Sequence, residues 1–170
     1  MKVGLISDTH GVFGEEFKSF FESVDVLWHC GDFGGDDAFI ESIRSFKPIV
    51  AVRGNCDGQV VRNYFPEVQI FEEQGLKILM THIAGSPGHY NYRVQALIDA
   101  HSPDVLVCGH SHILKVMYDK QYNLMYINPG ASGYQGWQLE RTALRFGIEG
   151  GKLVGMELLR LPNKKFNFYL

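Results

Sequence analysis

Five short apolar runs in this 170-residue chain each end at residues that can bind a metal ion, and this pattern constrains the fold most. Two of the runs are Val3 to Ile6 and Val105 to Cys108. The five clusters that follow the runs are Ser7-Asp8-Thr9-His10, Gly31-Asp32, Gly54-Asn55, Thr81-His82 and Gly109-His110-Ser111-His112. Apolar runs of this length, bounded by turn residues, indicate buried strands.

Helical periodicity separates these expected strands through the first two thirds of the chain. The first helix is expected near Phe13 to Val24, where apolar residues share one face. The second is expected near Asp36 to Phe46, which opens with two aspartates suited to a helix N-terminus. The third runs from about Tyr90 to His101. Strands that alternate with helices predict an α/β fold with parallel strands.

Paired strands are expected after residue 60, where turn residues separate successive apolar segments. The three pairs are Val68 to Phe71 with Lys77 to Met80, Leu114 to Tyr118 with Leu124 to Ile127, and Ala143 to Ile148 with Leu153 to Leu161. This mixture predicts two sheets packed face to face with helices outside. The absence of a repeat or linker predicts one domain over residues 1–170. Phe166, Phe168 and Leu170 are expected to form a last strand in a sheet, with an exposed partner-binding edge as the alternative.

The clusters are expected to meet, because ligands of open α/β sheets gather beyond the carboxyl ends of the strands. The seven candidate metal ligands are Asp8, His10, Asp32, Asn55, His82, His110 and His112. A lone Asp or His after a strand is usually a turn or cap residue, but seven in this order indicate a shared site. Asp8 and His10 are two positions apart, as are His110 and His112, so an extended backbone would turn each pair to one side.

The charges of this set suit phosphate chemistry. Two divalent cations, the two aspartates and a bridging hydroxide leave one net positive charge if the histidines are neutral. Such a site attracts a phosphate anion, and two metal ions can activate a hydroxide and stabilise an in-line displacement. Asp32 has two oxygens that could bridge the cations, and Asn55 offers a neutral oxygen. Phosphoester hydrolysis is therefore the leading chemistry.

The chain resembles the calcineurin-like metallophosphoesterases, and within them the YfcE-type phosphodiesterase group. The resemblance is carried by Asp8-Thr9-His10, Gly31-Asp32, Gly54-Asn55-Cys56-Asp57, His82 and Gly109-His110-Ser111-His112, with Asn128-Pro129-Gly130 as the following loop. It implies a four-layer αββα sandwich. It also implies Asp8, His10, Asp32 and His112 at one metal ion, and Asp32, Asn55, His82 and His110 at the other. Asp32 would bridge the two ions.

One departure from the wider superfamily concerns the general acid. Many members have a His after the Asn of the third block, whereas this chain has Cys56, a feature that the YfcE-type group shares. The alternatives are substrates with acidic leaving groups, another proton donor, or protonation by water. We take Asp32, Asn55, His82 and Asp57 as the catalytic candidates. Asp57 is expected to orient His110 or a loop amide rather than to act as the acid.

The cysteines bear on the choice of metal. Cys30, Cys56 and Cys108 all lie within two residues of a proposed ligand, but we interpret them as small core residues, the usual role of free cysteine. With oxygen and imidazole donors only, Mn²⁺ fits best, and Fe, Ni, Zn or Mg are alternatives.

Substrate contacts are expected on the rim of the site. Ile83 stands where a Gly commonly follows the fifth-block His, so residues 84–88 form an altered rim. Tyr90, Tyr92 and Arg93 follow this rim and could meet a phosphoester. An arginine there would bind phosphate bidentately, although exposed helix surfaces carry such arginines routinely.

The charge and cysteine content of the chain limit the binding partners and the cellular location that we expect. The formal net charge is −3 and the 16 Lys and Arg are scattered, so we expect neither stable nucleic-acid binding nor membrane binding. The first residues form no signal-peptide pattern, and three widely spaced cysteines suit a reducing compartment, so a cytoplasmic location is expected. The expected partner is a small-molecule phosphoester, and homo-oligomer formation stays open.

The sequence thus predicts a cytoplasmic, two-metal phosphoesterase that hydrolyses its substrate with a metal-activated hydroxide. Phosphodiesters are favoured over monoesters, because the resemblance points to them and no extra basic clamp for a dianion is visible. The main alternative is a non-catalytic protein-binding scaffold of the same fold, like the retromer vacuolar-sorting subunit, whose metal site is incomplete. A nuclease of the double-strand-break repair type would be expected to carry the missing His and a nucleic-acid module.

Overall fold

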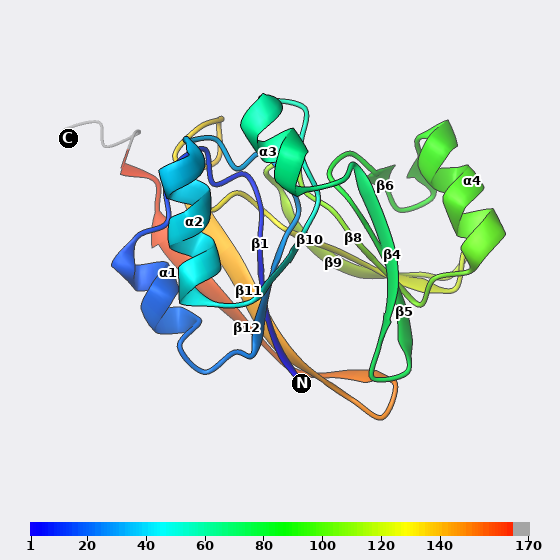
Figure 1. Ribbon diagram of the computed structural model, residues 1–170. Helices are drawn as coiled ribbons and strands as arrows, with labels where there is room; N and C mark the ends of the chain where they lie inside the picture. The colour runs from blue at the N-terminus through cyan, green and yellow to red at the C-terminus, as the bar shows by residue number, and fades with distance from the viewer. Residues whose placement is uncertain (165–170) are drawn as a thin grey trace.

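Two five-stranded sheets face each other, and helices lie against their outer faces (Figure 1). The computed structural model describes residues 1–164. The predicted α/β class and the layered αββα sandwich are confirmed. The expected last strand at Phe166, Phe168 and Leu170 lies outside the described residues.

The first sheet combines the expected parallel strands with the C-terminal strand pair. Its order is β12 (Lys152–Pro162), β11 (Glu140–Glu149), β1 (Lys2–Ile6), β2 (Val26–His29) and β3 (Ile49–Ala51). β1, β2 and β3 run parallel, while β11 pairs antiparallel with both β1 and β12. The carboxyl ends of the three parallel strands therefore lie along one edge of this sheet.

The second sheet contains the other two expected strand pairs. Its order is β4 (Val68–Glu73), β5 (Leu76–Thr81), β8 (Val105–Val107), β10 (Leu124–Pro129) and β9 (Leu114–Asp119). β8 runs parallel to both β5 and β10, and the outer strands pair antiparallel. A separate hairpin of β6 (Gly85–Ser86) and β7 (His89–Tyr90) was not expected from the sequence.

The described residues form four helices, of which the first and the last are shorter than the periodicity predicts. They are α1 (Glu15–Phe20), α2 (Asp37–Phe46), α3 (Gln59–Tyr64) and α4 (Tyr92–His101). α1 ends at Phe20 rather than near Val24, although Phe21 and Val24 stay buried in the turn that follows. The expected N-terminus of α2 is confirmed, because the Asp36 side chain accepts a hydrogen bond from the amide of Phe39.

α4 begins two residues later than expected. The side chain of Asn91 accepts a hydrogen bond from the amide of Val94 and so caps the helix, while Tyr90 belongs to β7. α3 was missed, since its six residues are too few for a periodic signal.

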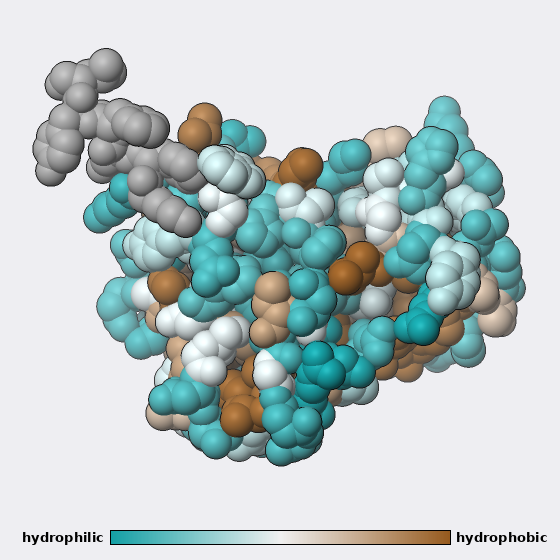
Figure 2. Space-filling model, turned by 90° about the horizontal axis from the view of Figure 1, so that it is seen from above, coloured by the Kyte–Doolittle hydropathy of each residue, from teal (hydrophilic) through white to brown (hydrophobic). Residues whose placement is uncertain are grey.

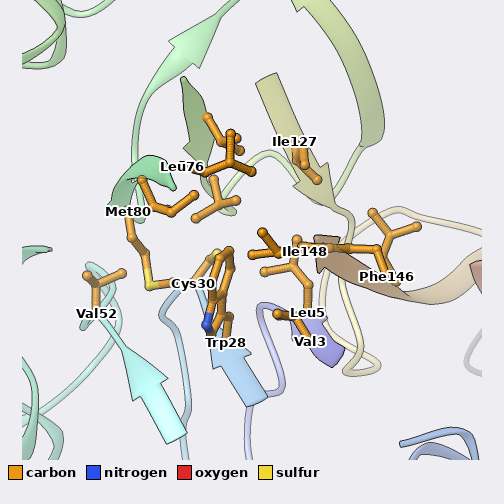
Figure 3. Packing of buried hydrophobic residues seen from close by; sticks show 14 residues of the cluster. Val3, Leu5, Trp28, Cys30, Val52, Leu76, Met80, Ile127, Phe146 and Ile148 are labelled. Carbon is orange, nitrogen blue, oxygen red and sulfur yellow. The ribbon is translucent and has the colours of Figure 1, made fainter. Parts of the chain in front are cut away.

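Strand alternation divides the apolar residues between three cores. Val3 and Leu5 of β1 and Trp28 of β2 point into the space between the sheets, where they meet Leu76 and Met80 of the second sheet (Figure 3). The residues that alternate with them along the strands point to the outer faces of the sheets, toward the helices. Ile6 and Leu27 pack beneath α1 and α2, and Leu79 and Leu106 pack beneath α4.

The loops after the parallel strands of both sheets lie at one edge of the sandwich, at the top of Figure 1. The N-terminus and the β4–β5 turn lie at the opposite edge. Buried strands thus hold the loops that carry the candidate ligands. Through residue 164, none of the helices has the length and apolar character needed to cross a bilayer.

Candidate metal centre

All seven candidate ligands lie in loops at the carboxyl ends of strands. Asp8 and His10 follow β1, Asp32 follows β2, Asn55 follows β3, His82 follows β5, and His110 and His112 follow β8. Ligand atoms of Asp8, His10 and His112 lie within 4.8 Å of one another, as do those of Asp8, Asp32 and His82. Residues separated by up to 104 positions in the sequence therefore surround one small volume.

The side-chain contacts link these two groups into one cluster. Nε2 of His112 lies 3.2 Å from Oδ1 of Asp8, and Nε2 of His82 lies 3.4 Å from Oδ2 of Asp32. Oδ1 of Asn55 lies 3.1 Å from Nε2 of His82. His10 Nε2 is 4.0 Å from the same Asp32 oxygen. Asp32 therefore faces ligands of both groups, and Asp8 belongs to both.

His110 joins the cluster through His82. The ring centroids of the two histidines are 5.2 Å apart. The amide of His110 donates a hydrogen bond of 3.1 Å to Oδ2 of Asp8, which fixes the loop after β8 against the loop after β1. The structure thus brings together every residue that the sequence nominated as a metal ligand.

The backbone at the ligands is not extended, contrary to the geometry expected for the two closely spaced pairs. Five of the seven ligands have positive φ angles between 45° and 67°, namely Asp8, His10, Asp32, His110 and His112. Non-glycine residues rarely adopt this left-handed conformation, which costs roughly 1–2 kcal/mol per residue. Such residues cluster at functional sites, where the surrounding structure enforces them.

Two glycines permit the close approach of the ligand loops. A Cβ atom on Gly54 would lie 2.1 Å from Oδ1 of Asp32, and one on Gly109 would lie 1.9 Å from Oγ of Ser7 and 2.9 Å from Oδ2 of Asp8. No other residue fits at these positions without moving a carboxylate ligand or the loop beside it. The glycines that precede Asn55 and His110 in the sequence therefore have a steric role.

A backbone carbonyl sets the tautomer of His82. Nδ1 of His82 lies 2.7 Å from the carbonyl oxygen of Cys30. Because a carbonyl can only accept, Nδ1 carries the hydrogen, and in the neutral ring Nε2 has a free lone pair. That nitrogen faces Asp32 and Asn55, so the lone pair of His82 is available to a cation at this position.

Gln138 fixes His112 in the same way, and sequence reasoning missed it. Nε2 of Gln138 donates to the carbonyls of Gly133 and Gln135, which leaves Oε1 to accept from Nδ1 of His112 at 3.1 Å. Nε2 of His112 is then free to face Asp8. Gln138 lies 26 positions after its partner in a loop without regular structure, so no sequence pattern marks it.

The carboxylate of Asp57 binds three backbone amides of the ligand loops. Binding a loop amide is one of the two roles that the sequence predicts for this residue. Oδ2 of Asp57 accepts hydrogen bonds from the amides of Gly54 (2.7 Å) and Asp32 (2.9 Å), and Oδ1 accepts from the amide of Gly34 (3.2 Å). The Asp57 carboxylate makes no hydrogen bond to His110, so the other predicted alternative is not seen among the described residues. Asp57 is 3% exposed, so these hydrogen bonds are shielded from water.

His29 connects the first two ligand loops from beneath. Its Nδ1 accepts a hydrogen bond from the amide of Gly31, and its Nε2 donates to Oγ of Thr9, whose hydroxyl donates onward to the carbonyl of Phe33. The ring is fully buried and stacks on Phe33. Burial lowers the pKa of His29 to about 3, which keeps it neutral.

Burial and neighbouring charges act differently on the candidate ligands. Burial lowers the pKa values of His10 and His110. The contact with Asp8 raises the pKa of His112. Burial opposes the charged forms of His82 and Asp32, but their mutual contact outweighs it, so the pKa of His82 is raised and that of Asp32 is lowered.

The residues of this cluster fit a divalent cation. Oδ1 of Asp8 is buried without a hydrogen-bond partner, and a buried carboxylate oxygen left unpaired is costly. Two ring nitrogens, from His112 at 3.2 Å and His82 at 3.9 Å, face this oxygen. Carboxylate, amide and imidazole donors of this kind suit first-row divalent metals. A cation among them would satisfy the unpaired oxygen.

No cysteine sulfur belongs to either group of candidate ligand atoms among the described residues, and one of the three cysteines differs from expectation. Cys30 and Cys108 are buried core residues, as predicted. Cys56 is exposed, so its interpretation as a core residue was wrong. Its backbone amide donates to Oδ1 of Asp32, and its sulfur lies 3.4 Å from Nδ2 of Asn55.

The two proposed substrate residues have different surroundings. Tyr90 is 8% exposed, its hydroxyl donates to Oδ2 of Asp119, and it packs with Tyr122 and Tyr126, so the structure does not bring it to the ligand cluster. Arg93 is exposed and lines a cavity that also contains Asn55 and His82. Viewed from above, the molecule shows mainly hydrophilic residues with isolated apolar ones on this face (Figure 2).

Comparisons with solved structures agree with this fold. An archaeal phosphodiesterase is 23% identical, with a TM-score of 0.74 over 95% of this chain and 100% of that chain. Wild-type Vps29 of Entamoeba histolytica, complexed with Zn²⁺, is 16% identical, with a TM-score of 0.72 over 96% of this chain and 99% of that chain. A conserved Streptococcus pneumoniae protein described as a predicted phosphoesterase is 19% identical, with a TM-score of 0.65 over 96% and 90%.

A comparison with curated proteins found no match. The model of the calcineurin-like phosphoesterase superfamily domain, in contrast, matches residues 1–151 and includes all seven candidate ligands. The resemblance carried by the five sequence blocks is therefore confirmed at the level of the whole family domain, and the chain belongs to the calcineurin-like phosphoesterase superfamily.

Proposed function

We propose that this protein is a phosphodiesterase that depends on two divalent cations, with Mn²⁺ as the preferred metal. The observation that carries the proposal is the convergence of two carboxylates, one amide oxygen and four imidazoles in one cluster that contains the unpaired Oδ1 of Asp8. Superfamily membership supports hydrolytic chemistry at this position. The similar archaeal structure is itself a phosphodiesterase, which favours diesters over monoesters.

The seven ligands divide into two sets that share Asp32. Asp8, His10 and His112 would hold one cation, and Asn55, His82 and His110 would hold the other. Bound cations in such a site supply a nucleophile near neutral pH and neutralise charge on the phosphoryl group. Gln138 and the Cys30 carbonyl keep the two Nε2 atoms of His112 and His82 turned toward the site. Asp57 acts as a positioning residue that holds the loops of Asp32 and Asn55 together.

Departure of the leaving group is expected without help from an imidazole. The residue after Asn55 is Cys56, whose side chain is exposed, so no histidine stands where one commonly donates a proton in the superfamily. We therefore expect diesters with acidic alcohols, such as aryl esters, to be hydrolysed faster than alkyl diesters. A rate that is insensitive to the acidity of the alcohol would indicate another proton donor.

The direct test is hydrolysis of bis(4-nitrophenyl) phosphate by protein loaded with Mn²⁺. We expect turnover that EDTA abolishes and that Asp32→Ala or His82→Ala removes. The control is His101→Ala, which changes an exposed histidine at the end of α4 and should retain activity. Full metal loading without turnover of any phosphoester would refute the proposal.

The competing function is a protein-binding scaffold, which the similarity to Vps29 structures keeps open. The Zn²⁺ complex of Vps29 means that metal binding alone does not separate the two functions. Turnover does separate them, so the assay above is decisive.

The proposal includes a cytoplasmic location, a single domain and a small-molecule substrate. Three free cysteines favour the reducing cytoplasm, and we treat residues 1–170 as one unit that acts on a small-molecule phosphoester.

A further inference from the structure

A cavity of about 490 Å³ opens beside the metal centre. Asn55 and His82 line both the cavity and the candidate metal site, so the two spaces are continuous. The other walls come from α3, from the first turn of α4 and from residues next to β4. A phosphodiester held at the metal centre has two ester groups, and this cavity is placed to receive one of them.

The charges on the cavity wall are mainly positive. Arg53, Arg62 and Arg93 line it, whereas Glu67 is its one acidic residue among the residues that the structure describes. Arg53 lies 3.0 Å from Oε2 of Glu67, and Arg93 lies 3.7 Å from Oε1. A single carboxylate is therefore shared between two guanidinium groups, and the four side chains carry a formal excess of two positive charges.

Arg62 has no acidic partner within residues 1–164. Its Nε donates a hydrogen bond of 3.0 Å to the carbonyl of Asp57, which anchors the guanidinium to the loop that carries Asn55. The two terminal amino groups make no hydrogen bond to any described residue. An arginine that is fixed at Nε and free at its outer edge can bind an oxyanion with both terminal groups.

The start of α4 adds to the positive potential. Asn91, Tyr92, Arg93 and Val94 all line the cavity, and they form the N-terminal cap and first turn of a ten-residue helix. No acidic residue occurs in that first turn. The partial positive charge of the helix N-terminus therefore faces the same space as the three arginines, and Glu67, which is paired with Arg53 and Arg93, is the one carboxylate nearby among the described residues.

Apolar side chains form the remaining wall. Val68, Val94 and Leu97 line the cavity together with Ile83, beside the aromatic ring of Tyr92. A ligand group that fills this space would therefore have an uncharged part against the apolar wall and an anionic part against the arginines. Inorganic phosphate alone would leave the apolar wall without a contact.

We propose that this cavity binds one ester substituent of the substrate and that this substituent carries a second phosphate group, which Arg62 and Arg93 recognise. The inference rests on the proposed phosphodiesterase function, because it assumes that the scissile phosphate lies at the metal centre. The substrate class is thus a small phosphodiester with an additional terminal phosphate, such as a short oligonucleotide with a phosphorylated end.

Two substrates that differ in one group test the preference. They are the adenosine dinucleotide with a 5′-phosphate and the same dinucleotide without it, both assayed with the Mn²⁺-loaded protein. We expect kcat/KM to be about tenfold or more higher for the phosphorylated form, the size expected for hydrogen bonds to a charged group. Arg62→Gln should reduce this ratio toward one. Arg160→Gln, which removes an exposed arginine on β12, should preserve the ratio.

A binding measurement on the metal-free protein gives a second readout. Inorganic pyrophosphate titrated into EDTA-treated protein should bind more weakly as salt is added, and Arg62→Gln and Arg93→Gln should each raise its Kd severalfold relative to Arg160→Gln. Equal Kd values in the wild type and the three variants would overturn the inference. Equal kcat/KM values for the two dinucleotides would do the same. Failure to hydrolyse either dinucleotide or bis(4-nitrophenyl) phosphate, with pyrophosphate binding intact, would instead overturn the phosphodiesterase assignment.

Discussion

Nδ1 of His112 donates a hydrogen bond to Oε1 of Gln138, 3.1 Å away, and this contact leaves Nε2 of the histidine facing Asp8 in the candidate metal site. The amide of Gln138 is itself held by the carbonyls of Gly133 and Gln135. The loop around Gln138 thus orients a ligand that follows β8 in the other sheet. Partners of this kind tune metal affinity although they do not touch the metal.

Replacing Gln138 by Met should weaken metal binding. The change keeps the length of the side chain but removes the acceptor, so His112 loses its fixed tautomer, and we expect Mn²⁺ affinity to fall about 10- to 100-fold. Isothermal titration calorimetry measures the effect. Gln135→Met is the matched control, since it alters an exposed glutamine of the same loop whose side chain makes no hydrogen bond within residues 1–164. Equal affinities in the two variants would contradict the orienting role.

Gly54→Ala should disrupt the site through a single methyl group. The new Cβ would lie 2.1 Å from Oδ1 of Asp32, so the carboxylate or the loop must move. We expect a loss of about 1–3 kcal/mol in the free energy of unfolding, together with reduced Mn²⁺ affinity. Gly58→Ala serves as the comparison, because nothing lies within 4 Å of its Cβ position. Unchanged metal affinity in Gly54→Ala would show that the close approach has no functional role.

His29 should make the stability of the metal-free protein depend on pH. Its pKa is about 3 in the folded state, against about 6.5 when the chain is unfolded. Between these values only the unfolded chain binds the proton. The contribution of His29 to the free energy of unfolding is therefore fully present above the unfolded pKa and is lost as the pH is lowered, by up to about 1.4 kcal/mol per pH unit.

Urea unfolding of wild type and His29→Phe, in EDTA between pH 7 and pH 5, measures this contribution. The variant loses the hydrogen bonds to Thr9 and Gly31 and should be less stable at pH 7. Its stability should vary less with pH, so the two curves should converge as the pH falls. Parallel curves would mean that His29 is protonated equally in both states.

Asp57→Asn should loosen the loops of two ligands at once. An amide group cannot accept hydrogen bonds on both of its atoms, so at least one of the three backbone amides now bound to Asp57 would lose its partner. We expect a destabilisation of about 1–3 kcal/mol and a lower kcat with bound Mn²⁺. Asp99→Asn, on the exposed face of α4, should change neither quantity. A stable variant with full activity would remove Asp57 from the proposed machinery.

The positions of the ligands could be predicted because each follows a buried strand. The strands before Asp8 and before His110 can be recognised from their local apolar composition alone. Because parallel strands have their carboxyl ends at one edge of a sheet, the residues that follow them lie close together. The helix start at Asp36 was predictable for a similar reason, since its cap lies within three residues of the amide it binds.

The internal geometry of the site was not predictable in the same way. Asp8 and His10 converge through a turn with positive φ angles rather than through an extended backbone, and these angles are imposed by contacts with distant loops. The role of Gln138 and the Arg62 hydrogen bond to Asp57 depend on tertiary contacts with no local signature. α3 and the β6–β7 hairpin are too short for their periodicity to be recognised.

The central claim is that the seven ligands hold two cations around a shared carboxylate. Anomalous diffraction from crystals grown with Mn²⁺ tests it most directly. The account predicts two peaks roughly 3.5–4 Å apart, one beside Asp8 and His112 and one beside Asn55 and His82, with Asp32 between them. A single peak, or peaks away from these side chains, would contradict it.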